Sequence, residues 1–228
     1  MNKVAVIVAG GMGQRMQNVI PKQFIQLGGQ PLLVHTLRAF LDAYKDIQLI
    51  VVLPASHEAQ GRLIIDEYFP DQTIQLTTGG DTRYQSVQHG LSLVQEESII
   101  FVHDGVRCLV SSSLIQRCYE TAAQHGSAIP VLTSSDSIRI RTAEGHHPQD
   151  RNQVLLVQTP QTFHSSWILP AFQQEYNPSF TDEATVVETT GRKLTLVEGE
   201  ESNLKITRPV DLVIAAQWLS ARAATMHL

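Results

Sequence analysis

The sequence predicts an α/β fold that is built on a mainly parallel sheet. Apolar, β-branched runs alternate along the chain with segments of helical periodicity, as when Val4–Val8 is followed by Leu32–Ala43. Runs such as Gln48–Leu53 and Ser98–Val102 are almost wholly apolar, which is typical of parallel strands buried on both faces. With 228 residues, 43% of them hydrophobic, the chain suits one domain over residues 1–228 with a sizeable core.

In the first half of the chain, each expected helix follows a turn or a capping residue. Pro31 precedes an amphipathic helix, Ser56 is a candidate N-cap, and Gly79-Gly80 ends a short strand before a further helix. We expect strands at Val4–Val8, Gln48–Leu53, Thr73–Thr77 and Ser98–Val102, and helices at Leu32–Ala43, at Glu58–Tyr68 and across Ser86–Leu91.

The second half continues the alternation around one irregular segment. A Ser-rich start favours a helix at Ser111, Thr181-Asp182-Glu183 reads as a cap, and Pro209 suits the first turn of the closing helix. We expect helices at Ser111–His125, Ser165–Tyr176, Asp182–Thr190 and Val210–Ala221, and strands at Ala128–Leu132 and Lys193–Val197, with Thr159–Phe163 returning to the core.

Residues 133–158 form the irregular segment, which is polar and alternating. Ile138, Ile140 and the later run Val154–Val157 predict a protruding β-hairpin with one polar face. A hairpin isolated from a sheet is marginally stable. Packing on a second subunit would stabilise the hairpin, and so would closure over the protein's own site. The pattern does not distinguish between these two arrangements.

A glycine loop directly after the first strand carries the chemistry. Gly10, Gly11 and Gly13 allow a sharp turn and close approach to a ligand, and backbone N–H groups in such a turn can cradle an anion. Arg15 and Lys22 add two cations. Neither the dinucleotide fingerprint nor the Walker loop fits this spacing. A glycine loop alone could be a plain turn, but with Arg15 and Pro21-Lys22 it resembles the polyphosphate grip of the sugar-phosphate nucleotidyltransferases.

Composition narrows the class of protein. A net charge of −5 gives no general basic surface for nucleic acid. Cys108 and Cys118 are too few for a disulfide framework, so we expect reduced, packed thiols. Met1–Lys3 lead straight into a strand, and no apolar run approaches the ~20 residues of a membrane span. We therefore expect a cytoplasmic protein that binds neither membrane nor nucleic acid.

Several stretches, in order along residues 4 to about 215, together resemble one family, the 2-C-methyl-D-erythritol 4-phosphate cytidylyltransferases of non-mevalonate isoprenoid biosynthesis. No one of them is as specific as the set. The stretches are Ala9–Met16, Pro21–Phe24, Gly79–Arg83 with Ser86, Val102–Arg107, Asp150-Arg151, Gln158–Gln161, Thr181–Ala184 and Asn203–Pro209.

The resemblance implies a Rossmann-like nucleotidyltransferase core and a homodimer that exchanges its β-arm, residues 133–158. It implies that CTP and 2-C-methyl-D-erythritol 4-phosphate give 4-diphosphocytidyl-2-C-methyl-D-erythritol and pyrophosphate, with Mg²⁺ as cofactor. It also favours dimer contact over a flap for the arm.

The resemblance also implies roles for particular residues. Arg15 and Lys22 would be catalytic and stabilise the pentacoordinate transition state. The CTP-binding residues would be Ala9, Gly10, Gly11, Gly13, Gly80, Asp81 and Ser86. The residues that position the polyol phosphate would be Asp104, Arg107, Ser137, Arg151, Thr159 and Lys205, with Arg151 serving the neighbouring subunit.

Some of these residues have a second interpretation. Asp104, at the end of a strand, could instead bind Mg²⁺ or a substrate hydroxyl. Asp81 could simply cap a helix, and Arg83 could support phosphate or form a salt bridge. His103 is expected to be a structural hydrogen-bonding residue, because a phosphate monoester needs little deprotonation near pH 7. His146-His147 is expected to be an exposed pair.

Two departures from the family pattern bear on the site. Cys108 stands where the family often has proline, which could loosen the loop or expose a reactive thiol. Ser202 stands where the family commonly has an aspartate, and Glu200 and Glu201 are shifted from that position. The sequence therefore does not assign the ligands of the metal ion.

Two other functions compete with this interpretation. A ribitol-5-phosphate cytidylyltransferase shares the fold and chemistry, but the short spacer 17–20 resembles the isoprenoid enzymes. A non-catalytic nucleotide-binding protein would not need Arg15, Lys22, Asp104, Arg151 and Lys205 together.

Overall fold

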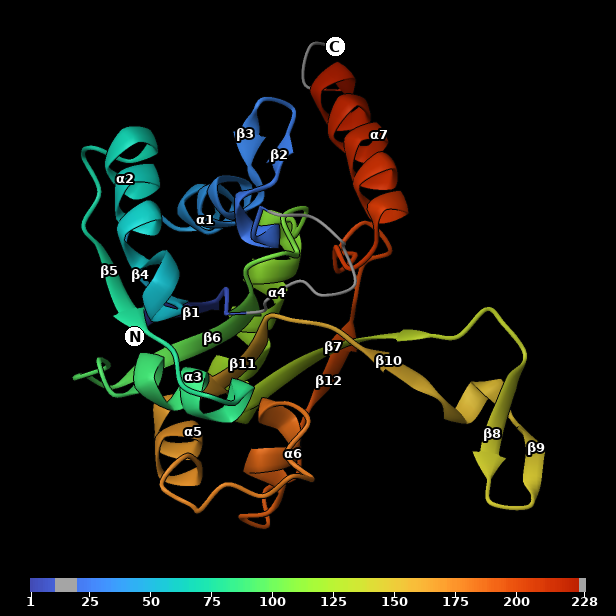
Figure 1. Ribbon diagram of the computed structural model, residues 1–228. Helices are drawn as coiled ribbons and strands as arrows, with labels where there is room; N and C mark the ends of the chain where they lie inside the picture. Colours follow the sequence, from blue (N-terminus) through green and yellow to red (C-terminus); the bar gives the residue numbers. More distant parts are fainter. Residues whose placement is uncertain (11–19, 226–228) are drawn as a thin grey trace.

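A central sheet organises the molecule, and the computed structural model describes it in residues 1–10 and 20–225 (Figure 1). Its eight strands run in the order β10-β7-β11-β6-β1-β4-β5, with β12 pairing with β7. The strands are β1 (Asn2–Val8), β4 (Gln48–Leu53), β5 (Ile74–Thr78), β6 (Ser98–Asp104), β7 (Ser127–Thr133), β10 (Leu155–Val157), β11 (Gln161–His164) and β12 (Leu196–Glu198).

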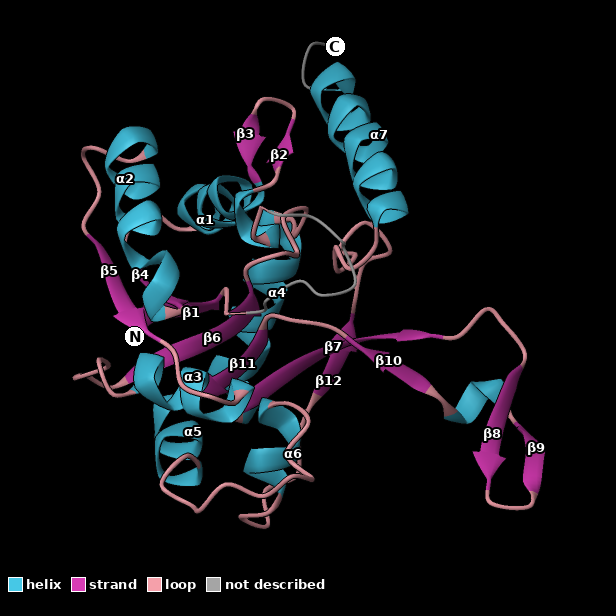
Figure 2. Ribbon diagram, viewed as in Figure 1, coloured by secondary structure: helices cyan, strands magenta, loops and turns pink. Residues whose placement is uncertain are grey.

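Helices cover both faces of the sheet (Figure 2). Side chains of β1 alternate between two apolar cores: Ala5 and Ile7 pack on one face, and Val4 and Val6 pack on the other. The helices of the first core are α1 (Leu32–Ala43), α2 (Glu58–Tyr68) and α4 (Ser112–His125); those of the second are α3 (Arg83–Leu91), α5 (Ser165–Ala171) and α6 (Glu183–Glu188).

Four of the seven strand pairs described in the central sheet are parallel, and this confirms the predicted α/β class with a mainly parallel sheet. β1 pairs in parallel with β4 and β6, β4 with β5, and β7 with β12. β11 is antiparallel to both β6 and β7, and β10 is antiparallel to β7. Several loops therefore gather at the carboxyl ends of the parallel strands, where open α/β sheets bind ligands.

Close backbone contacts hold these loops together. The Ala9 amide donates to the Val52 carbonyl at 2.9 Å, and the Gly105 amide donates to the Val8 carbonyl at 2.9 Å. A Cβ on Gly105 would lie 2.8 Å from the Ala9 Cβ, so only glycine allows the two loops to approach this closely. The start of the first glycine loop is thus fixed against the loop after β6.

The closing helix α7 (Pro209–Thr225) packs on a third, smaller core. A short hairpin that the sequence pattern did not predict, β2 (Gln26–Leu27) and β3 (Gln30–Pro31), contributes to it. Gly28 and Gly29 make the hairpin's turn with φ of 57° and 82°, a left-handed conformation that favours glycine. No helix among the described residues is long and apolar enough to cross a bilayer.

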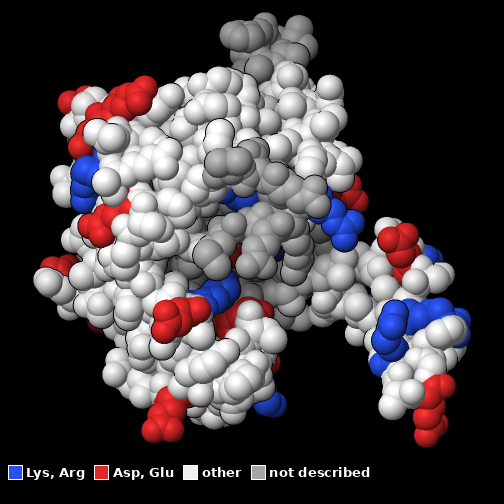
Figure 3. Space-filling view, in the orientation of Figure 1, with Lys and Arg blue, Asp and Glu red and all other residues white. Residues whose placement is uncertain are grey.

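The arm projects from the body beside β10 (Figure 1). Its hairpin pairs β8 (Ile138–Thr142) with β9 (Gly145–Gln149). The prediction that Val154–Val157 forms the second strand of this hairpin was wrong. β10 pairs instead with the end of β7. The 3₁₀ turn Arg151–Gln153 connects β10 to the hairpin. Arm side chains include arginines and carboxylates on the exposed surface (Figure 3).

Three predicted elements are shorter than expected. The helix expected at Ser165–Tyr176 ends at Ala171, directly after Pro170, and the one expected at Asp182–Thr190 covers Glu183–Glu188. The last strand begins at Leu196 rather than Lys193. The predicted loop residues Gly11, Gly13 and Arg15 lie outside the described residues.

Candidate active site

Asp104 ends β6 at the carboxyl edge of the sheet, and three cations surround its carboxylate. Its Oδ2 lies 3.1 Å from both Arg107 Nε and Lys205 Nζ, and its Oδ1 lies 3.5 Å from Arg83 Nη2. Burial alone would raise the pKa of Asp104, but Arg83, Lys205 and Arg107 outweigh burial and hold that pKa well below its usual range. Asp104 is therefore a fixed anion that gathers cations from three parts of the chain.

Arg83 joins this cluster to a second buried carboxylate. Its Nη1 and Nη2 contact Oε1 and Oε2 of Glu183, the latter pair at 3.1 Å. Burial raises the pKa of Glu183, and Arg83 partly offsets that rise. Burial acts to lower the pKa of Arg83, yet Glu183 and Asp104 more than reverse it, so the guanidinium stays charged. Of the two interpretations left open for Arg83, the structure shows the salt bridge.

A chain of hydrogen bonds fixes the backbone behind Asp104. The Asp104 amide donates to Thr159 Oγ1 at 3.1 Å, and that hydroxyl lies 3.1 Å from His103 Nδ1. His103 Nε2 lies 3.2 Å from the Arg107 carbonyl, which can only accept, so Nε2 carries the proton and Nδ1 accepts from Thr159. Burial lowers the pKa of His103 to about 4, consistent with this neutral tautomer. His103 and Thr159 thus support Asp104 from within the core.

Asn203 ties the Lys205 loop to the same strand ends. Its Nδ2 donates to the Thr159 carbonyl at 2.8 Å, and its own carbonyl accepts from Arg107 Nη1 at 2.9 Å. Gln158 binds this loop too, donating to the Glu200 carbonyl at 2.8 Å. A buried polar network therefore holds Arg107 and anchors the loop that carries Lys205.

The Gly79-Gly80 turn lies against α3 on the neighbouring side. Ser86 Oγ accepts from the Gly80 amide at 3.2 Å and donates to the Thr82 carbonyl at 2.9 Å. A Cβ built on Gly10 would lie 3.8 Å from the same oxygen, so the first glycine loop begins beside Ser86. Thr82, in a capping box with Gln85, caps the helix; Asp81 does not, and it is exposed. Asp81 is thus available for the predicted ligand contact.

Lys22 begins the short 3₁₀ turn Lys22–Phe24 that follows Pro21 and is half-buried there. Gln23 and Phe24 beside it are buried, which anchors the turn in the body. Arg15, its predicted catalytic counterpart, lies outside the described residues, as do Gly11 and Gly13.

The surroundings of Asp104 do not fit a preformed Mg²⁺ site. Both of its oxygens already face cations, and the described residues contain no cluster of three or more His, Cys, Asp or Glu side chains placed to hold a metal ion. Mg²⁺ in phosphate-transfer sites usually takes one or two carboxylates and completes its shell with water and substrate phosphates. The side chains around Asp104 therefore support a role in ion pairs more than a role as a Mg²⁺ ligand.

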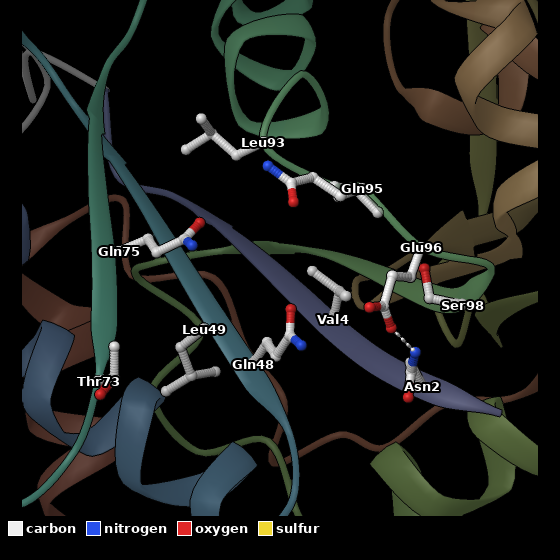
Figure 4. A pocket seen from close by; sticks show the side chains of 11 residues that line it. Asn2, Val4, Gln48, Leu49, Thr73, Gln75, Leu93, Gln95, Glu96 and Ser98 are labelled. Carbon is white, nitrogen blue, oxygen red and sulfur yellow. Dashed lines mark hydrogen bonds between the residues drawn. The ribbon is translucent and has the colours of Figure 1, made fainter.

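A separate concavity of about 400 Å³ lies at the opposite edge of the sheet (Figure 4). Gln48, Gln75 and Glu96 line it near the amino ends of the strands, where α/β sheets seldom bind substrates. None of the predicted site residues lines it. The Asp104 cluster is therefore the stronger candidate for chemistry.

Comparison with known proteins decides the family. The family model described as 2-C-methyl-D-erythritol 4-phosphate cytidylyltransferase matches residues 3–221. Proteins of that name from Phocaeicola vulgatus and Bacteroides thetaiotaomicron are 43% and 42% identical, over 94% and 96% of this chain and 98% and 100% of theirs. The chain belongs to the 2-C-methyl-D-erythritol 4-phosphate cytidylyltransferase family.

Solved structures agree with the sequence comparison. The 4-diphosphocytidyl-2C-methyl-D-erythritol synthase of Anaerococcus prevotii superposes with a TM-score of 0.81 at 27% identity, covering 96% of both chains. The 2-C-methyl-D-erythritol 4-phosphate cytidylyltransferase of Thermus thermophilus superposes with a TM-score of 0.76 at 32% identity, covering 96% of this chain and 98% of its own. These matches confirm the expected nucleotidyltransferase fold.

Arg151 and Ser137, which the cytidylyltransferase resemblance assigned to positioning of the polyol phosphate, lie on the arm. Arg151 Nη1 donates to the Ser135 carbonyl at 2.7 Å, and Ser137 is exposed before β8. The arm extends away from the body that carries Asp104 (Figure 1). Within one chain, the structure therefore brings together Asp104, Arg107, Thr159 and Lys205 but not Arg151 and Ser137.

The two departures from the cytidylyltransferase pattern have local explanations. Cys108 is buried in the third core, and burial raises its pKa to about 12, which argues against a reactive thiolate. Ser202 accepts a hydrogen bond from Arg222 Nη2 at 3.1 Å. Glu200 turns toward the start of α4, where Ser111 donates to it at 2.6 Å. Glu200 therefore binds α4 in this structure.

Sequence reasoning did not assign the partner of Arg83. Glu183 was identified only as part of a helix cap and of a family stretch. A signal existed, because Thr181-Asp182-Glu183 offers two acidic residues where one cap suffices.

Proposed function

We propose that this chain transfers the cytidylyl group of CTP to 2-C-methyl-D-erythritol 4-phosphate, giving 4-diphosphocytidyl-2-C-methyl-D-erythritol and pyrophosphate. The cluster of Arg83, Arg107 and Lys205 around Asp104 is the observation that carries the proposal. It stands at the ligand-binding edge of a sheet in a chain that belongs to this enzyme family.

The reaction is a displacement at phosphorus. An oxygen of the polyol phosphate forms a bond to the α-phosphorus of CTP, the bond from that phosphorus to the bridging oxygen breaks, and pyrophosphate leaves with the electron pair. Both reactants are anions, so the barrier comes from repulsion, positioning and charge growth at the α-phosphate. Fixed cations address all three without a covalent intermediate.

The residues divide this work by location. Arg15 and Lys22 are proposed to stabilise charge at the α-phosphate, and the turn at Gly80, Asp81 and Ser86 to bind cytidine beside Ala9 and Gly10. Arg107 and Lys205 are proposed to hold the phosphate of the polyol. The Lys205 side chain is 43% exposed, so its ammonium can reach a phosphate while it remains near Asp104.

We propose that a divalent cation arrives with the triphosphate of CTP, whose oxygens are suitable hard ligands. When bound, it would offset the negative charge of the triphosphate. Because the described carboxylates do not form a cage for it, no step is assigned to a metal held by the protein.

We further propose that residues 1–228 act as one catalytic domain and that two copies exchange their arms, so that Arg151 and Ser137 serve the second subunit's site. Several arm side chains support this: Ile140, Leu155, Leu156 and Val157 are 43%, 42%, 50% and 43% exposed. A second copy that covered them would remove apolar surface from water.

Pyrophosphate release tests the reaction. The protein is assayed with Mg²⁺, CTP and either 2-C-methyl-D-erythritol 4-phosphate or ribitol 5-phosphate, and the first assay is repeated with excess chelator. We expect turnover with the methylerythritol phosphate and its loss on chelation. Preference for ribitol phosphate would overturn the proposed substrate. Absence of pyrophosphate release with either polyol phosphate would overturn the proposed activity. Unchanged turnover after chelation would overturn the divalent-cation proposal alone.

A further inference from the structure

Glu183 is a buried carboxylate that helix capping does not explain. It is the first residue of α6 and is 1% exposed. Asp182 already caps this helix, accepting from the Thr185 amide at 2.9 Å within a capping box that the Thr185 hydroxyl completes. A buried carboxylate is costly unless it is paired. Capping of α6 therefore does not explain why the Glu183 carboxylate is buried.

Arg83 is the ion-pair partner of Glu183, and its planar guanidinium gives the pair a defined orientation. Both terminal nitrogens of its guanidinium meet the two oxygens of Glu183. Such a fork-to-fork contact fixes the plane of the guanidinium, which one point charge opposite another would not do. The same Nη2 lies 3.5 Å from Asp104 Oδ1. The orientation of Glu183 is thus transmitted to Asp104.

The far side of Asp104 completes the path. A carboxylate is rigid and planar, so a contact that holds Oδ1 also restricts Oδ2. Oδ2 is the oxygen shared at 3.1 Å by Arg107 Nε and Lys205 Nζ. Lys205 is the most exposed of the three cationic side chains, at 43% against 31% for Arg83 and 11% for Arg107. Its ammonium is therefore the one whose position depends most on Asp104.

Glu183 also sets the charge of the cluster. Three cations, Arg83, Arg107 and Lys205, face two carboxylates, Asp104 and Glu183, which leaves a formal charge of +1. Without Glu183, Arg83 would be free to turn its full fork onto Asp104. That rearrangement would compete with Arg107 and Lys205 for the same two oxygens.

We propose that Glu183 is a positioning residue for the polyol phosphate: through Arg83 it holds Asp104 in the orientation that places Arg107 and Lys205 on the substrate. The inference rests on the proposed function and deepens it, because it assigns a role to a residue that contacts no reacting atom.

Glu183→Gln tests the proposal with little change in volume. Its charge and one of its two acceptor oxygens are lost. We expect kcat/KM for 2-C-methyl-D-erythritol 4-phosphate to fall about tenfold or more, because misplacement by about 1 Å can cost up to 10²-fold. The Kd of CTP, measured by calorimetry without the second substrate, should change less than about twofold, since the Gly80-Ser86 contacts do not involve Glu183.

Arg83→Lys separates geometry from charge. It keeps the cation but removes the planar fork, so we expect a loss of kcat/KM similar to that of Glu183→Gln. If Glu183→Gln does not fold, the kcat/KM of Arg83→Lys tests the proposal by itself. Wild-type kcat/KM in Arg83→Lys would overturn the proposal, because the charge would then suffice.

Thr185→Ala is the matched control at the same helix end. It breaks the capping box but leaves Glu183 and Arg83 in place, so Tm should fall while kcat/KM stays at the wild-type level. If Glu183→Gln behaves like this control, or weakens CTP binding as much as kcat/KM, Glu183 is merely structural and the proposal fails. Absence of turnover in the wild type would instead refute the proposed function, and the inference would fall with it.

Discussion

At the scale of single residues, Lys22 is the described cation to which catalysis is assigned. Lys22→Ala is expected to lower kcat by roughly 10²–10³-fold, the usual effect of removing one group that stabilises transition-state charge. Its turn should persist, because Gln23 and Phe24 remain buried. Lys45→Ala is the control: its side chain is 83% exposed and pairs with Asp42, so turnover should not change. Steady-state kinetics with circular dichroism decide, and near-normal turnover in Lys22→Ala would refute the role.

The two thiols make a second prediction at this scale. Burial raises the pKa values of Cys108 and Cys118 to about 12, far above the ordinary value of about 8.5. In the folded protein at pH 8, both thiols should therefore stay protonated and react slowly with a disulfide reagent such as 5,5′-dithiobis(2-nitrobenzoic acid). After unfolding in guanidinium chloride, both should react at once. Fast labelling of one thiol in the native protein would restore Cys108 as a candidate reactive residue.

At the scale of single elements, α3 connects helix stability to CTP binding. Thr82 caps the helix, and its carbonyl accepts from the Ser86 hydroxyl that also binds the Gly80 amide. Thr82→Ala should reduce the free energy of unfolding by about 1 kcal/mol and raise the KM for CTP several-fold. Thr82→Ser keeps the capping oxygen and should resemble the wild type. Equal KM values for CTP in all three proteins would show that the Thr82 cap does not contribute to CTP binding.

The elements also show what patterning can and cannot predict. β1, β4 and β6 were predictable because strands buried on both faces are continuous apolar runs. The hairpin partner β9, with the sequence Gly-His-His-Pro-Gln, was not, because its residues are mostly exposed and only backbone pairing makes it a strand. The apolar run Val154–Val157 was predicted as the hairpin partner instead, although its residues Leu155–Val157 form β10 and pair with β7.

The site divides in the same way. Asp104, Arg107 and Lys205 lie in stretches that carry the resemblance to the cytidylyltransferases, and the structure brings them together. The pairing of Arg83 with Glu183 joins residues 100 positions apart, and no local pattern reports such a contact. Whether Arg15, Lys22 and Arg151 act as assigned stays a prediction.

At the scale of the whole molecule, the arm decides whether one chain holds a complete site. Arg151 hydrogen-bonds within the arm, and the arm projects from the body of the chain (Figure 1). Exposed Leu155, Leu156 and Val157 offer an apolar surface beside it. An exchanged dimer would bury that surface and bring Arg151 to the other subunit's site, and this arrangement makes a quantitative prediction.

Lys22→Ala and Arg151→Ala chains, each nearly inactive, should recover about a quarter of wild-type turnover when mixed equally and allowed to exchange subunits. Half of the dimers would then be mixed, and each would combine an intact Lys22 with an intact Arg151 at one of two sites. Mixing Lys22→Ala with Lys205→Ala is the control. Both residues belong to the body of one chain, so no mixed dimer contains an intact site and no activity should return. If the Arg151→Ala mixture also stays inactive after mass spectrometry confirms exchange, Arg151 does not act across the dimer.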